Sequence, residues 1–296
     1  MSAPRRFEHA RLRVPALEPA VAFYVEVMGL VELGRDGGTV YLGAGLDTNF
    51  DLALVEGGTG LEHFALRADG EEELAALERS ARDAGLAAER RGGEGPGEVD
   101  AVAFELPSGH RMEFVTVEDQ RYLEPYRPAL PGRGTMALLD ADHINITAPN
   151  ARGVTELLRD GLGFRLSDVI ELEDGSWLGA WSRLGELHHD VAILLDPDPA
   201  HTLHHFAWTC ASVGHLARCC DRLSEAGIRL EIGIGRHPAG ANAFAYFMDP
   251  TGNRMELSAE MALVNDAMPV RMWSSPGDTF DAWGDPVVPD SFRQGT

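Results

Sequence analysis

One short motif occurs four times along this chain, and it constrains the fold more than any other feature. Each copy has an acidic residue or a histidine, then a histidine, then a stretch in which apolar and polar residues alternate. The copies are Glu8–Val14, Glu62–Ala68, Asp142–Ala148 and His204–Cys210. Alternation of this kind is typical of a β-strand with one buried face. The repetition therefore predicts four related modules, each of which opens with a strand.

A second motif indicates that the chain consists of two similar halves. It occurs at Phe104–Phe114 and at Phe247–Leu257, and both copies fit a strand, a turn that contains glycine, and a second strand. Equivalent residues of the two halves lie about 140 positions apart. We therefore predict an α+β protein in which four βαβββ modules pair into two similar domains.

Each opening strand is followed by a helical pattern that ends near a glycine, the residue that most readily adopts the left-handed conformation at a helix end. The expected helices are Glu18–Met28, Glu71–Ala84, Ala151–Arg159 (before Gly161) and Val213–Ala226. Short strands are expected after them, among them Gly38–Leu42, Asp51–Val55, Trp177–Arg183 and Asp190–Leu195.

Segments rich in proline and glycine predict the domain limits. We expect an N-terminal two-module domain at residues 1–121, a linker at 122–140, a C-terminal two-module domain at 141–260, and a tail at 261–296. The tail contains Trp273, Phe280 and Trp283. Large aromatic side chains seldom stay in solvent, so we expect the tail to pack on the C-terminal domain. A lid over a binding pocket is the alternative for these aromatic residues.

Charge and hydropathy exclude several classes of partner. The formal net charge is −22, and so acidic a surface repels phosphate groups, so we expect no nucleic-acid partner. We expect no membrane segment, because the apolar runs fall far short of the ~18 residues that a membrane helix needs. The N-terminal residues lack the apolar core of a secretory signal, and the three cysteines do not form a disulfide framework. We therefore expect a cytoplasmic protein.

The repeated histidines predict a metal centre in the second half. His143 and His205 occupy the same position in the third and fourth modules, and Glu256 lies on the last predicted strand. Two histidines and one carboxylate form a facial triad, which leaves coordination positions open and is typical of non-haem Fe(II) enzymes. Neighbours along a strand face opposite sides, so His204 is expected on the other face from His205. For any one of these histidines alone, a packing or capping role is the alternative.

Further stretches carry a resemblance to a known family. They are Leu139–His143, Gly161–Arg165, His189–Ala192, Leu203–Ala207, Gly235–His237, Tyr246–Glu256 and Trp283–Pro289, with Phe23–Val25 and Met28–Leu30 in the first half. Together they resemble the type I extradiol ring-cleavage dioxygenases of the vicinal oxygen chelate superfamily, the group of catechol 2,3-dioxygenase and homoprotocatechuate 2,3-dioxygenase. The resemblance implies a glyoxalase-like fold with a catalytic C-terminal domain.

The resemblance also implies the reaction and the metal. A catechol and O2 would be the substrates, and the ring would open next to the two hydroxyl groups. The implied cofactor is Fe(II), with Mn(II) as the alternative that the same ligands accept. His143, His205 and Glu256 would be the metal ligands. Similar enzymes are homo-oligomers, and we expect the same here.

Five more residues match positions at which the family contacts substrate or oxygen. An imidazole exchanges protons near neutral pH, which suits the acid/base that the resemblance implies at His189. The resemblance further implies that His237 and Tyr246 form hydrogen bonds with substrate oxygens. It also implies that Asn145 and Trp181 line the substrate site. Ordinary packing in the core is the alternative for the last two.

One departure from the family concerns the substrate. The homoprotocatechuate enzymes carry arginines for the side-chain carboxylate of their substrate, whereas Ile232, Thr279 and Phe280 stand at the matching positions here. A carboxylate that loses its water without gaining a cation is strongly disfavoured. We therefore expect a catechol with an uncharged or apolar substituent.

The first half repeats the ligand set as His9, His63 and Glu113. The family's N-terminal domain usually holds no metal, so we interpret this set as a relic of duplication. Two other functions remain open from the sequence. One is a metal-dependent isomerase or lyase of the same superfamily, which would need a further carboxylate ligand. The other is a non-catalytic protein that binds an aromatic compound.

Overall fold

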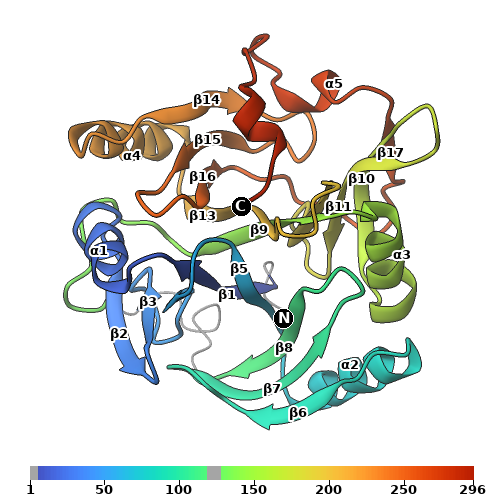
Figure 1. Ribbon diagram of the computed structural model, residues 1–296, viewed down its shortest axis with the longest axis horizontal. Coiled ribbons are helices and arrows are strands. Elements are labelled where there is room, and N and C mark those ends of the chain that lie inside the picture. The colour runs from blue at the N-terminus through green and yellow to red at the C-terminus, as the bar shows by residue number, and fades with distance from the viewer. Residues whose placement is uncertain (1–5, 119–127) are drawn as a thin grey trace.

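The computed structural model describes residues 6–118 and 128–296, and its first half contains two βαβββ modules (Figure 1). The first module consists of β1 (Phe7–Val14), α1 (Leu17–Ala22), the π-helical turn Phe23–Val27, β2 (Val31–Asp36), β3 (Thr39–Gly43) and β4 (Leu52–Glu56). The second consists of β5 (Leu61–Arg67), α2 (Glu71–Asp83), β6 (Glu89–Gly92), β7 (Glu98–Glu105) and β8 (Arg111–Val117).

The second half repeats this order and adds a tail. The third module consists of β9 (Ala141–Ala148), α3 (Ala151–Leu162), β10 (Arg165–Glu171), β11 (Trp177–Arg183) and β12 (Val191–Leu195). The fourth consists of β13 (Leu203–Cys210), α4 (Val213–Glu225), β14 (Leu230–Arg236), β15 (Ala243–Met248) and β16 (Arg254–Ala259). The tail holds β17 (Arg271–Trp273), α5 (Gly277–Phe280) and the 3-10 helix Asp290–Arg293. The predicted α+β class and the four βαβββ modules are confirmed.

Two curved sheets carry the strands. The first has the order β2-β3-β4-β1-β5-β8-β7-β6, and the second has the order β14-β15-β16-β13-β9-β12-β11-β10-β17. In each module the first strand pairs in parallel with the last, and the first strands of the two modules of a half pair antiparallel at the centre of the sheet. The histidine motifs therefore meet at the middle of each sheet.

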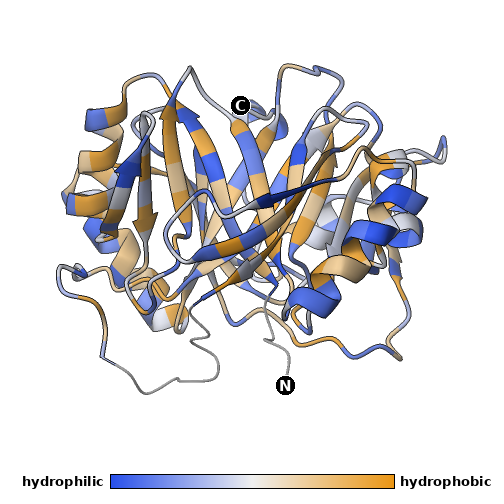
Figure 2. Cartoon of the chain, turned by 90° about the horizontal axis from the view of Figure 1, so that it is seen from below, coloured by the Kyte–Doolittle hydropathy of each residue, from blue (hydrophilic) through white to orange (hydrophobic). Residues whose placement is uncertain are grey.

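One continuous apolar core joins the two halves. It contains residues of both sheets, including Phe64 of β5 and Phe206 of β13. Hydrophobic and hydrophilic residues alternate along the central strands in Figure 2, as the sequence pattern predicts. A hydrogen bond of 2.5 Å from the Tyr24 hydroxyl to Asp249 Oδ2 also links the halves. The two halves therefore stabilise each other through a shared core and a buried hydrogen bond.

The helices follow the prediction with two differences. α3 extends beyond Arg159 to Leu162 and ends at Gly163, which has a φ of +77°. Gly161 lies inside the helix, where a Cβ would come within 2.8 Å of the Ala84 Cβ, so this glycine permits close approach of helices and does not end one. The other difference is that residues 18–28 divide into α1 and the π-helical turn.

The tail contacts the C-terminal sheet. β17 pairs with β10, and Phe292 packs on Tyr246 of β15. Trp283, however, is 56% exposed and lies over the guanidinium of Arg236. The tail therefore does not bury all of its aromatic side chains. Residues 1–5, on which the signal expectation depends, and part of the linker, 122–127, lie outside the described residues. The domain limits stay predictions.

Candidate metal centre

Three adjacent strands bring His143, His205 and Glu256 together in the second half. His143 lies on β9, His205 on β13 and Glu256 on β16, and β13 is hydrogen-bonded between the other two. All three side chains are buried. The sequence predicted this grouping because the repeat placed both histidines in opening strands, and the fold pairs opening strands with each other.

The distances within this cluster fit one metal ion. The Nε2 atoms of His143 and His205 lie 3.2 Å apart, and Glu256 Oε2 lies 3.1 Å from the first and 3.0 Å from the second. Bonds of about 2.1 Å from a metal to imidazole nitrogen and carboxylate oxygen, at right angles to each other, place neighbouring ligand atoms about 3.0 Å apart. The three atoms therefore have the spacing of three adjacent positions of an octahedral site.

Each of the three candidate ligands is oriented by a hydrogen bond to its atom that points away from the centre of the cluster. Asp142 Oδ1 accepts from His143 Nδ1 at 2.8 Å, and Asn242 Nδ2 donates to Glu256 Oε1 at 3.0 Å. His204 Nε2 donates to the Phe292 carbonyl at 2.7 Å, so the neutral ring accepts at Nδ1 from His205 Nδ1, 2.7 Å away. Each bond leaves the metal-facing atom free to act as an electron-pair donor.

The sequence did not reveal all of these supporting contacts. His204 was expected on the opposite face of β13, and its ring does reach the tail, yet it also orients His205. Asp142 carried a signal, because an acidic residue precedes the histidine in three of the four motifs. No signal in the sequence pointed to Asn242, since it lies before β15 and reaches Glu256 only because β15 pairs with β16.

Burial and the neighbouring charges set the protonation of the cluster. Burial favours a neutral His143, but Glu256 and Asp142 beside it raise the pKa of His143 to about 9. Burial lowers the pKa of His205 to about 4. Burial would raise the pKa of Glu256, but the two histidines lower it below its ordinary value. At neutral pH one proton, on His143, must therefore leave before a metal binds.

This proton makes metal affinity depend on pH. Because a group with a pKa of about 9 is protonated at neutral pH, the apparent affinity for Mn²⁺ is expected to rise by roughly tenfold per unit between pH 7 and 8. Calorimetry in buffers with different heats of ionisation measures the proton released. An affinity that does not change over this range, with no proton released, would contradict the charge state assigned to His143.

Three more predicted residues surround the cluster. The ring of His189 lies 4.2 Å from that of His143, and the ring of Tyr246 lies 5.2 Å from that of His205. His237 Nδ1 donates to the Phe280 carbonyl at 2.6 Å, so its Nε2 accepts from the Tyr246 hydroxyl at 2.9 Å. Burial lowers the pKa of both His189 and His237, and burial with the charge of Glu256 raises the pKa of Tyr246 well above its ordinary value.

Asn145 and Trp181 lie in one row across the sheet. Trp181 pairs with Ala192, Ala192 with Asn145, and Asn145 with His205. Cross-strand neighbours share a face of the sheet, so this row faces the same side as His205. Within the described part of the chain, the buried Asn145 Oδ1 has no hydrogen-bond partner. Asn145 and Trp181 are thus placed where they can line a substrate site beside the cluster, and their role in substrate binding stays a prediction.

In the corresponding cluster of the first half, arginines pair with the carboxylate. His9, His63 and Glu113 are also close together and buried. Arg91 forms an ion pair with Glu113 Oε2, and Arg111 Nε donates to Glu113 Oε1 at 2.9 Å. Burial, then Arg11 and Arg91, lower the pKa of His9 well below its usual range. These guanidinium groups satisfy the carboxylate and repel a second cation, so the absence of a metal in this cluster stays our prediction.

We therefore expect one metal ion per chain. Elemental analysis of the reconstituted protein should give one equivalent, and His63→Ala should leave that value unchanged. A content of two equivalents that falls to one in His63→Ala would show that the first cluster binds metal.

Other expectations from the sequence concern the membrane, the cellular location and the oligomeric state of the protein. Among residues 6–118 and 128–296 there is no helix whose length and hydropathy would let it cross a membrane. The cytoplasmic location and the homo-oligomer stay predictions.

The comparisons with known proteins agree with this site. Residues 140–257 match the Glyoxalase/Bleomycin resistance protein/Dioxygenase superfamily. The chain is 31% identical to a manganese-dependent 2,3-dihydroxybiphenyl 1,2-dioxygenase of Geobacillus genomosp. 3, over 88% of this chain and 87% of that protein. It is 29% identical to a metapyrocatechase of Geobacillus stearothermophilus, over 96% and 90%.

Solved structures lead to the same family. Homoprotocatechuate 2,3-dioxygenase of Brevibacterium fuscum, in complex with 3,4-dihydroxyphenylacetate, superposes with a TM-score of 0.84 at 27% identity and covers 99% of this chain and 92% of its own. The same enzyme of Arthrobacter globiformis gives a TM-score of 0.84 at 28% identity, over 100% and 93%. The chain therefore belongs to the metal-dependent extradiol ring-cleavage dioxygenases of the vicinal oxygen chelate superfamily.

Proposed function

We propose that this extradiol dioxygenase uses Fe(II) to cleave a catechol that carries an uncharged or apolar substituent. The observation that carries the proposal is the set of three buried ligand atoms, 3.0 to 3.2 Å apart, with an apolar cluster of side chains next to them. His143, His205 and Glu256 would hold the metal, which when bound supplies the coordination positions at which catechol and O2 meet.

His189 is proposed to move the protons of the reaction. Burial keeps its pKa low and its ring neutral at neutral pH, so Nε2 can accept a proton from a catechol hydroxyl. The same atom can return that proton to oxygen as the ring opens. The high pKa of Tyr246 keeps its hydroxyl protonated, and the bond it donates to His237 fixes the position of the phenol oxygen, which can accept from a substrate hydroxyl.

The apolar substituent is inferred from the side chains beside Tyr246. Ile232, Phe244 and Phe292 form one buried cluster with Tyr246, and Phe280 packs against it. Arg254 lies over the ring of Phe292 in this cluster, and its guanidinium is bound to Glu231 at 2.7 Å. A substrate carboxylate placed here would lose water without gaining a free cation.

Oxygen uptake across a panel of catechols tests this proposal. The Fe(II)-reconstituted protein is expected to consume one O2 per catechol, to form a yellow product, and to prefer alkyl- or aryl-substituted catechols over 3,4-dihydroxyphenylacetate by roughly 100-fold in kcat/KM, since an unpaired buried charge costs a few kcal/mol. Fastest turnover of the carboxylated catechol would reject the apolar site. Failure to cleave any catechol, with metal bound, would favour an isomerase or lyase.

Mn(II) is the second candidate metal, because one relative is manganese-dependent by name. Anaerobic protein loaded with each metal in turn separates the two. Turnover at least tenfold faster with Fe(II) supports the proposal, and faster turnover with Mn(II) overturns the choice of metal but not the reaction.

A further inference from the structure

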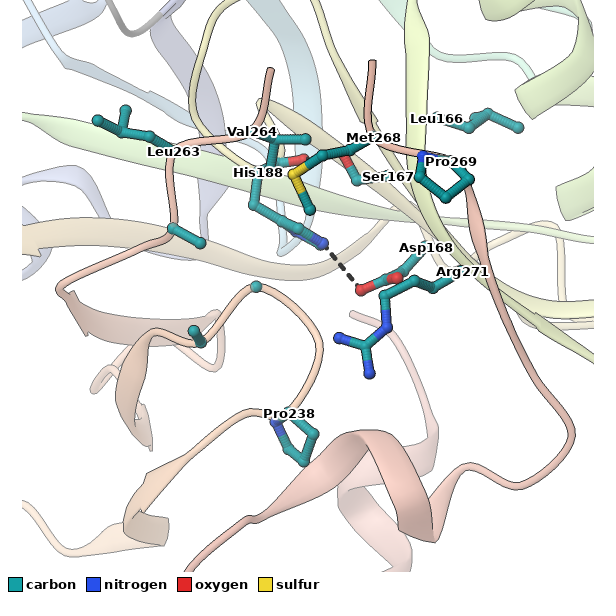
Figure 3. A pocket seen from close by; sticks show the side chains of 13 residues that line it. Leu166, Ser167, Asp168, His188, Pro238, Leu263, Val264, Met268, Pro269 and Arg271 are labelled. Carbon is teal, nitrogen blue, oxygen red and sulfur yellow. Dashed lines mark hydrogen bonds and ion pairs between the residues drawn. The ribbon is translucent and has the colours of Figure 1, made fainter. Parts of the chain in front are cut away.

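A buried chain of hydrogen bonds begins at His189 and continues through His188 to Asp168, and Figure 3 shows the bond between the last two. His188 Nδ1 lies 3.0 Å from His189 Nδ1, and His188 Nε2 lies 2.9 Å from Asp168 Oδ2. All three side chains are buried. Neither His188 nor Asp168 belongs to the ligand set, and nothing in the sequence analysis gave either of them a function.

The protein holds this chain in a fixed position. The backbone N–H of His188 donates to the Ala262 carbonyl at 2.9 Å, and the His188 carbonyl accepts from Ser167 Oγ at 2.6 Å. Gly240 lies against the imidazole, and a Cβ at that residue would come within 3.1 Å of His188 Nδ1. The tail, β10 and the loop before β15 thus all contribute to the placement of one ring.

The direction of the hydrogen bonds follows from the carboxylate at the end. A carboxylate oxygen accepts, so His188 Nε2 donates to Asp168 Oδ2, and a His188 ring that carries a single proton then accepts at Nδ1. The proton in the bond between the two histidines therefore lies on His189 Nδ1. His189 Nε2 is then unprotonated, which is the state that a base requires at the atom proposed to face substrate.

The buried Asp168 borders a small pocket. Asp168, His188 and Arg271 line a pocket of about 100 Å³, drawn in Figure 3. In the described chain Asp168 Oδ1 has no hydrogen-bond partner. A pocket of this size has room for water beside the buried carboxylate.

We propose that Asp168 and His188 are positioning residues that hold the proton of His189 on Nδ1 and fix the orientation of its ring, with Nε2 toward the substrate. The proton leaves a catechol hydroxyl, binds to His189 Nε2 and later returns to oxygen, so none is gained or lost. The inference rests on the proposed function of His189 in proton transfer.

Kinetics of matched variants provide one test. His188→Leu and Asp168→Asn are each expected to lower kcat by about 10- to 100-fold, the usual effect of losing such a supporting partner, with metal content and the KM for catechol within about twofold. The double variant should lose no more than the worse single one, because both residues act through one chain. His188→Gln, whose amide oxygen can accept from His189 Nδ1, should recover part of the loss.

Met268→Ala is the control, because Met268 lines the same pocket without joining the chain, and its kcat should stay within about twofold of the parent. A His188→Leu enzyme with parental kcat, or a double variant whose loss is the product of the single losses, would overturn the proposal.

The tautomer of His189 provides a test that needs no turnover. Nitrogen NMR of the Zn²⁺-loaded protein, with ¹⁵N-labelled histidine, should show His189 protonated at Nδ1 in the parent and a mixture of tautomers in His188→Leu. Protonation at Nε2 in the parent would overturn the positioning role even if the enzyme is active. The expected tautomer in a protein that cleaves no catechol would instead reject the proposed function alone.

Discussion

Replacing Glu256 with glutamine is expected to abolish metal binding and ring cleavage together. The substitution keeps the size of the side chain and removes the one negative charge among three ligands that lie 3.0 to 3.2 Å apart. Metal content should fall from one equivalent per chain to below about a tenth, and oxygen uptake with catechol by at least about 10³-fold. Elemental analysis and an oxygen electrode measure the two quantities.

Glu113→Gln is the matched control, because Glu113 is the equivalent residue of the first half. Its two arginine partners lose their carboxylate, so we expect a lower melting temperature but an unchanged metal content. Full metal content in Glu256→Gln, or loss of metal in Glu113→Gln, would mean that the metal lies elsewhere.

Replacing His189 with asparagine is expected to lower kcat by about 10²- to 10⁴-fold, which is the usual contribution of a positioned acid/base. Asparagine keeps a polar group but cannot take up and return a proton near neutral pH. The ligand set is untouched, so metal content and anaerobic binding of catechol should stay as in the parent. Single-turnover spectra of the enzyme–catechol complex mixed with O2 measure the chemical step directly.

His201→Asn is the control for this experiment. His201 is bound to Asp196, away from the cluster, and its replacement should leave kcat within about twofold of the parent. A His189→Asn enzyme with parental kcat would assign proton transfer to another residue, and Tyr246 and His237 would then be the next to replace.

The repeat allowed the fold to be predicted from sequence because a duplicated module leaves the same pattern at each copy. Four alternating strands with a histidine at one position, and glycines after the helices, were sufficient for four βαβββ modules. The pairing of the ligands followed as well, since opening strands of partner modules meet at the centre of a sheet. The family resemblance then supplied roles for His189, His237 and Tyr246 that spacing alone does not carry.

The tertiary structure decided matters that depend on residues from distant parts of the chain. Both halves contain two histidines and a glutamate in equivalent places, and the sequence pattern treats them alike. The difference arises because Arg91 of β6 reaches Glu113 across the sheet, whereas Asn242 reaches Glu256 and leaves its other oxygen free. Electrostatic repulsion and hydrogen bonding around each glutamate, which no local pattern records, thus distinguish the two clusters.

The sequence by itself therefore determined the modules, the sheet-forming strands and the three candidate ligands, because these depend on local periodicity and on repetition. Only the tertiary structure placed Asp168 and His188 behind His189, since that chain joins β10 to the loop before β12. Hydrogen-bond partners of a buried site are chosen by strand register and side-chain packing, which act between residues that are close in space and not in sequence.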